Sequence, residues 1–107
     1  MKLSESENQV LIELSKLFRE QFGAEEVCLY GSAARDQMDE GSDIDIFVVL
    51  PHVNWQIEKE IIKHCFDAEL ECGRVFSVVC YSIDDIQNSP LKESPLVLNV
   101  RKQGRRL

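Results

Sequence analysis

The residues of this chain best suited to chemistry are Gly31 and Ser32 and, after ten intervening positions, Asp43 and Asp45. A turn of small residues lets backbone N–H groups approach phosphate oxygens closely. Two carboxylates separated by one residue on a strand share a face, because strand side chains alternate with period two. Both can then reach Mg²⁺, which favours carboxylate and phosphate oxygens. The pattern predicts a pocket for a triphosphate and magnesium.

The surrounding elements would position these residues. Residues 26–30 are typical of a short strand that leads into Gly31, and residues 32–35 are typical of the first turns of a short helix. Tyr30 directly precedes Gly31, and strand alternation can turn its side chain away from the pocket. An acidic loop precedes the strongest strand, residues 43–50, whose odd-numbered residues include both acids. Beyond the acids this strand is apolar on both faces, so it is expected to be central and buried.

Helix signals complete the pattern. Ser4 and Glu7 have capping-box spacing, so a helix is expected from residue 4 or 6 to residue 22, with Gly23 as its stop. A second helix is expected between Asn54 and Gly73. Its apolar side comprises Trp55, Ile57, Ile61, Ile62, Cys65 and Phe66. A third strand is predicted over residues 74–81, and shorter helices near residues 82 and 94. The order α-β-α-β-α-β-α predicts one α/β (α+β) domain over residues 1–107, with helices packed on a small mixed sheet.

Composition limits the partners and the location. The formal net charge is −7, which argues against nucleic acid as a partner, because broad nucleic-acid binding depends on a basic surface. No apolar run approaches the roughly 18–20 residues that span a membrane. The N-terminus lacks a signal-peptide pattern, so a cytoplasmic protein without a membrane partner is expected. The basic end, residues 101–106, is predicted to be a solvated tail, and the four cysteines are predicted to be reduced core residues.

Two motifs together resemble a known family. Gly31-Ser32-Ala33-Ala34-Arg35, followed by Ser42-Asp43-Ile44-Asp45-Ile46-Phe47-Val48-Val49, is similar to the motif of the minimal nucleotidyltransferases of the polymerase-β superfamily. The likeness is strongest to small members that pair with a HEPN-domain protein in toxin–antitoxin modules. Residues 76–82 resemble that family's next strand and its exit. The resemblance spans roughly residues 11–100 and implies a polymerase-β-like fold.

The resemblance implies a role for each matched position. Gly31 and Ser32 would bind the terminal phosphates of a nucleoside triphosphate through N–H groups and a hydroxyl. Asp43 and Asp45 would be catalytic carboxylates and would bind Mg²⁺. The remaining nucleotide-binding positions would be Arg35 and Ser42. The implied reaction transfers a nucleoside monophosphate, AMP from ATP, to a hydroxyl of a partner such as a tyrosine of a HEPN toxin.

The chain departs from the family at the third catalytic position. There the family has a carboxylate on the next strand, and this sequence has Ser77. A serine is neutral and serves neither as a carboxylate ligand nor as a base at neutral pH. Two interpretations therefore stay open. The chain is an adenylyltransferase that modifies its partner, or it is a catalytically degenerate domain that acts as an antitoxin-type or nucleotide-binding module.

Overall fold

The computed structural model describes residues 3–34 and 43–107, and the sheet formed by these residues has the strand order β3-β2-β1-β4. The strands are β1 (Glu26–Tyr30), β2 (Ile44–Leu50), β3 (Phe76–Ser82) and β4 (Arg105–Arg106). Strand β1 pairs antiparallel with β2 and β4, and β2 pairs parallel with β3. The sheet is therefore mixed and β2 is central, as the sequence predicts.

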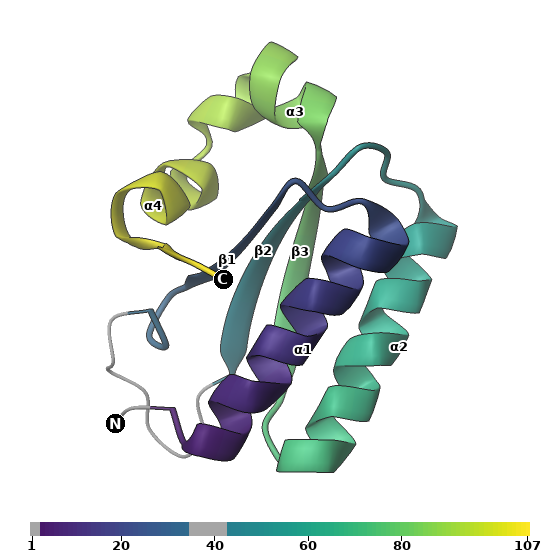
Figure 1. Cartoon of the computed structure of the whole chain (residues 1–107). Coiled ribbons are helices and arrows are strands. Elements are labelled where there is room, and N and C mark those ends of the chain that lie inside the picture. The colour runs from purple at the N-terminus through teal and green to yellow at the C-terminus, as the bar shows by residue number, and fades with distance from the viewer. Residues whose placement is uncertain (1–2, 35–42) are drawn as a thin grey trace.

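Helices cover the two faces of the sheet unequally. The long helices α1 (Glu5–Phe22) and α2 (Trp55–Cys72) lie side by side across one face (Figure 1). Beyond β3 come α3 (Ile83–Asn88), the 3₁₀ helix η1 (Pro90–Glu93) and α4 (Pro95–Gln103). On the opposite face, Val97 and Val100 of α4 pack with Phe47 in a smaller apolar cluster.

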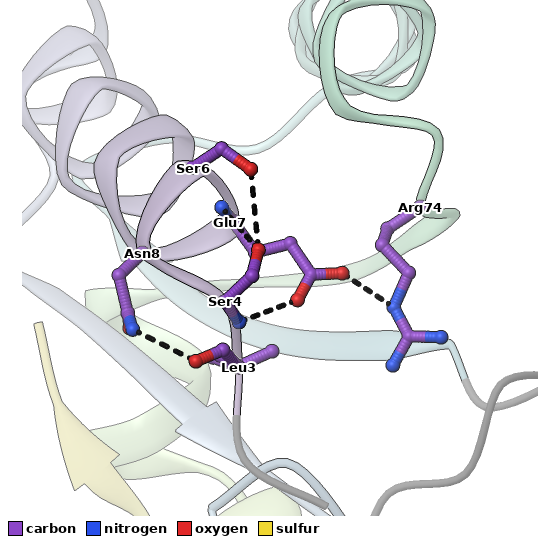
Figure 2. Close-up of polar contacts among 6 residues, drawn as sticks. All are labelled: Leu3, Ser4, Ser6, Glu7, Asn8 and Arg74. Carbon is purple, nitrogen blue, oxygen red and sulfur yellow. Dashed lines mark hydrogen bonds and ion pairs between the residues drawn. The ribbon is translucent and has the colours of Figure 1, made fainter.

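The N-terminal cap of α1 is also a tertiary contact. The hydroxyl of Ser4 accepts the N–H of Glu7 at 3.1 Å, and the Glu7 carboxylate accepts the N–H of Ser4 at 2.7 Å. The second carboxylate oxygen of Glu7 lies 2.9 Å from Nε of Arg74, and both side chains are nearly buried. Figure 2 shows Glu7 between the cap and Arg74. This ion pair ties the start of α1 to the residues that enter β3.

The predicted ends of the long helices are confirmed. Gly23 and Gly73 are the C-caps, with φ of 68° and 78°, a left-handed conformation that glycine adopts without steric cost. The side chain of Asn54 caps α2 by accepting the N–H of Ile57 at 2.9 Å. These signals are local to the chain, which explains why the sequence locates them.

Helix α2 is apolar on two sides, and only one of them is buried. Ile61, Cys65 and Ala68 face the core. Ile62 and Phe66, by contrast, are 56% and 61% exposed. The sequence predicts one apolar side that includes Trp55, Ile62 and Phe66, and the structure shows that these three side chains are exposed. The side of α2 that packs against α1 and β3 therefore includes only some of the apolar residues of this helix.

The C-terminal segment is more ordered than a solvated tail. Its last strand, β4, pairs with β1, and the N–H of Leu107 donates to the carbonyl of Val27 at 2.9 Å. Arg101 forms an ion pair with Glu26. The side chains of Arg105 and Arg106 are exposed, but their backbone belongs to the sheet. The tail prediction is therefore wrong for the backbone.

The observed order of elements differs from the prediction in two respects. Both η1 and β4 are additional. Residues 31–34 form a turn where the sequence predicts the start of a short helix, and residues 35–42 lie outside the described residues. Within the described ranges, none of the helices combines the length and apolarity that a membrane crossing requires.

Candidate active site

The turn after β1 touches the acidic start of β2. Gly31 has φ of 70°, and a Cβ placed on it would lie 2.6 Å from Oδ2 of Asp45. That distance is shorter than a carbon and an oxygen tolerate, so a side chain here would displace the Asp45 carboxylate, and the positive φ also favours glycine. The backbone of Gly31 thus lies against the carboxylate of Asp45.

Three neighbouring strands contribute one row of side chains at this end of the sheet. Asp45 on β2 lies opposite Tyr30 on β1 and beside Ser77 on β3. Side chains at paired positions of adjacent strands project from the same face. Tyr30 therefore shares the face of Asp45. The sequence left this open, because it does not reveal the antiparallel register between β1 and β2.

Ser77 contacts the other acid of the pair. Its hydroxyl donates a hydrogen bond to Oδ2 of Asp43 at 3.1 Å. Asp43 is exposed, and Ser77 and Asp45 are each half-buried. Ser77, where the resemblance implies a third carboxylate, thus lies beside both acids and presents a neutral hydroxyl.

The partly buried carboxylate of Asp45 dominates the electrostatics of this row of side chains. Burial raises the pKa of Asp45 above its usual value, and the neighbouring Asp43 carboxylate raises it further. Burial also raises the pKa of Tyr30, followed by the effects of Asp45 and Tyr81. Both effects disfavour the ionised form of Asp45, and a nearby cation would favour it again. The end of the sheet is therefore suited to positive charge.

The predicted site residues fall into two groups. Gly31, Asp43, Asp45 and Ser77 lie together at one end of the sheet, through the contacts given above. Ser32 follows Gly31 in the turn and is half-buried. Two predicted nucleotide-binding positions, Arg35 and Ser42, lie outside the described residues.

The oxygen atoms at this site are suited to a magnesium ion that takes its remaining ligands from phosphate and water. Within residues 3–34 and 43–107, no three His, Cys, Asp or Glu side chains group closely enough to form a complete metal cage. Mg²⁺ is usually held by one or two carboxylates together with substrate phosphates and water, and not by a dedicated protein cage. Asp43 and Asp45 supply two carboxylates, and Ser77 adds a hydroxyl beside them. These residues fit Mg²⁺ bound to a triphosphate.

Comparison with known proteins identifies the family. The sequence profile of the nucleotidyltransferase domain family matches residues 11–103. This chain belongs to that family. The matched range contains β1, the turn at Gly31, the acids of β2, and β3. No curated protein sequence matches the chain.

Solved structures share the fold of this nucleotidyltransferase domain. One is a toxin–antitoxin crystal structure with AMP-PNP, which is 22% identical with a TM-score of 0.62, over 94% of this chain and 70% of the other. A mutant of the toxin–antitoxin pair MntA–HpeT is 23% identical with a TM-score of 0.60, over 99% of this chain and 72% of the other. At this identity the likeness supports the α+β nucleotidyltransferase fold.

Proposed function

We propose that this nucleotidyltransferase domain binds Mg-ATP between the Gly31 turn and the Asp43–Asp45 pair, and transfers AMP to a hydroxyl of a partner protein, a tyrosine of a HEPN-type toxin. The observation that carries the proposal is the contact between the Gly31 backbone and the Asp45 carboxylate. A phosphate held by the N–H groups of this turn would therefore lie close to the Asp45 carboxylate. Family membership supports the reaction class.

The fold of the toxin–antitoxin structures supports the choice of nucleotide and partner. One of those structures contains AMP-PNP. The charge of this chain, −7, suits contact with a basic partner surface, since complementary charge steers association.

The reaction needs few groups from the protein. The acceptor oxygen attacks the α-phosphorus of ATP, an O–P bond forms, and the bond from that phosphorus to the bridging oxygen breaks to release pyrophosphate. Bound Mg²⁺ would neutralise charge on the phosphates and the leaving group. The backbone N–H groups at Gly31 and Ser32 would hold the phosphates. Because Ser77 accepts no proton, the acceptor's proton passes to a carboxylate of the pair or to water.

The test is the mass of the partner after incubation. The purified chain, ATP, Mg²⁺ and the HEPN-type protein encoded nearest to it should yield partner molecules heavier by one AMP group. Asp43→Asn should abolish the adduct, because it removes one of two carboxylate ligands. Asp67→Asn is the matched control, since Asp67 is an exposed acid on α2. Equal labelling by wild type and Asp43→Asn would contradict the proposal.

A second function is favoured by one observation. Ser77, where the resemblance implies a third catalytic carboxylate, is neutral and donates a hydrogen bond to Asp43. A domain that lacks this carboxylate can bind Mg-ATP, or a toxin, without turnover. Calorimetry with Mg-ATP, combined with a pyrophosphate-release assay, separates the cases. Binding without release would favour the module, and Ser77→Asp should then restore release if the rest of the site is intact.

A further inference from the structure

The outer edge of β3 offers unpaired backbone groups. Within the described residues β3 is the terminal strand of the sheet and pairs only with β2. The N–H of Ile44 donates to the carbonyl of Val75 at 2.8 Å. In this parallel register the odd-numbered residues of β3 direct their backbone groups toward β2. The groups of Phe76, Val78 and Cys80 therefore point to the open edge, which is a ready template for another strand.

A groove accompanies this edge on the side of α2. Two adjoining hollows, of about 380 and 320 Å³, share Ile62 and Val78 in their walls. The groove has apolar walls, which include the exposed side chains of Ile62 and Phe66. Exposed apolar surface of this kind beside an open strand marks an interaction site.

Two acidic side chains of α2 line the groove. Glu58 lines the first hollow and Glu69 the second, and both are half-buried. They are eleven residues apart, about three turns or 16 Å along the helix, so they lie on the same side of it. Neither carboxylate forms an ion pair within the ranges that the structure describes.

We propose that this groove, formed by the edge of β3 with Ile62, Phe66, Glu58 and Glu69 of α2, binds an extended segment of a partner protein as an additional strand. The segment is apolar on the side that faces α2 and carries a basic residue near each end. Backbone hydrogen bonds to Phe76, Val78 and Cys80 give affinity, and the two glutamates select a basic sequence.

Charge argues against a second copy of this chain as the occupant. Glu58 lies near the C-terminal part of β3, beside Tyr81, and Glu69 lies near its beginning, beside Phe76. If two copies paired their β3 edges antiparallel, each Glu58 would meet Glu69 of the other copy. Like charges brought together at an interface oppose association, whereas a basic segment would neutralise both acids.

The groove also leads to the candidate active site. Ser77, which donates to Asp43, lines the same hollow as Phe66 and Glu69. Alternate side chains of a strand added to β3 would project from the face that carries Ser77 and the acids, so one of them could present an acceptor hydroxyl there. This last step rests on the proposed function, whereas the binding of the strand does not.

The test uses amide NMR without nucleotide, so that it does not depend on catalysis. The probe is the blocked peptide Lys-Thr-Val-Thr-Val-Thr-Lys, whose lysines and valines share one face and whose ends lie about 20 Å apart when extended. At about millimolar concentration it should shift the amides of Phe76, Val78 and Cys80 saturably. The same peptide with glutamates in place of the lysines should bind at least about tenfold more weakly.

Charge reversal supplies the controls. Glu58→Lys combined with Glu69→Lys should reverse the preference, so that the glutamate peptide binds better. Glu60→Lys combined with Glu71→Lys has the same spacing and charge change, but these exposed residues lie on another side of α2 and should leave the preference unchanged. The proposal is overturned if the β3 amides do not shift, if both peptides bind equally, or if the two double variants behave alike.

Discussion

The two faces of strand β2 are used in opposite ways. On the face beneath α1 and α2, the residues Ile44, Ile46, Val48 and Leu50 have no exposed surface. On the other face, Asp43 is exposed and Asp45 half-buried before the strand becomes apolar at Phe47. One face therefore contributes packing along its whole length, whereas the other leaves its first part free for polar groups.

This difference separates residues important for stability from residues suited to chemistry within the stretch 43–50. The fully buried face keeps β2 in place, and the partly covered face carries two acids that packing alone does not require. A charge at a half-buried position costs stability unless a cation compensates it. Substitutions on the buried face should therefore lower stability, whereas substitutions of the acids should lower activity.

The largest effect is expected for the acids. Asp43→Asn and Asp45→Asn should each lower pyrophosphate release by about 10³-fold or more, because each removes one of two carboxylates that hold the charge of the metal and the transition state. Thermal unfolding should show that both variants remain folded. If either variant keeps near-normal release while Asp67→Asn is also normal, the assigned chemistry is wrong.

The opposite face should give a stability effect. Ile46→Ala should lower the free energy of unfolding by about 3 kcal/mol, because it leaves a cavity beneath α1 and α2. Urea denaturation measures the change. At low temperature, where the variant stays folded, its affinity for Mg-ATP should match that of wild type. A large loss of affinity in the folded variant would show that the two faces are not separate.

The turn at Gly31 should show a smaller and mixed effect. Gly31→Ala should cost about 1–2 kcal/mol of stability and should weaken Mg-ATP binding, because its Cβ would displace the Asp45 carboxylate. Gly73→Ala is the matched control, since Gly73 also has a positive φ but a Cβ there would meet nothing within 4 Å. Calorimetry should show weaker Mg-ATP binding for Gly31→Ala and unchanged binding for Gly73→Ala. Equal affinities of the two variants for Mg-ATP would contradict a nucleotide site at the Gly31–Asp45 contact.

The smallest effect concerns stability against pH without metal. The pKa of Asp45 is raised in the folded protein, so folding loses stability as pH rises from the ordinary aspartate value, about 4, through the folded value. Thermal unfolding should therefore show a free energy of unfolding for Asp45→Asn that exceeds the wild-type value by about 0.5 kcal/mol at pH 7, and this difference should disappear near pH 4. The effect is small because the carboxylate is partly solvated. A less stable variant at pH 7 would contradict this prediction.

The sequence predicts those parts of the molecule that depend on local signals. Ser4, Asn54, Gly23 and Gly73 define the long helices through caps that form within a few residues. The alternation of β2 likewise predicts that Asp43 and Asp45 share a face. Gly31 is recognisable as a turn residue, although its contact with Asp45 depends on the pairing of β1 with β2.

Features that depend on tertiary register are not predictable in this way. Tyr30 is placed beside Asp45 by the antiparallel register of β1 with β2, and the hydrogen bond from Ser77 to Asp43 depends on the parallel register of β3. The ion pair of Glu7 with Arg74 joins residues far apart in sequence. The exposure of Ile62 and Phe66 follows from how α2 meets its neighbours, which periodicity does not specify.

The central claim is that the Gly31 turn and the acids of β2 form one metal–nucleotide site. Replacement of Mg²⁺ by paramagnetic Mn²⁺ with ATP tests it directly through broadening of amide NMR signals. We expect strong broadening at Gly31, Asp45 and Ser77, much weaker broadening at Glu25, which bonds to Val49 near the opposite end of β2, and loss of the effect in Asp45→Asn. Broadening centred elsewhere, or unchanged in that variant, would contradict it.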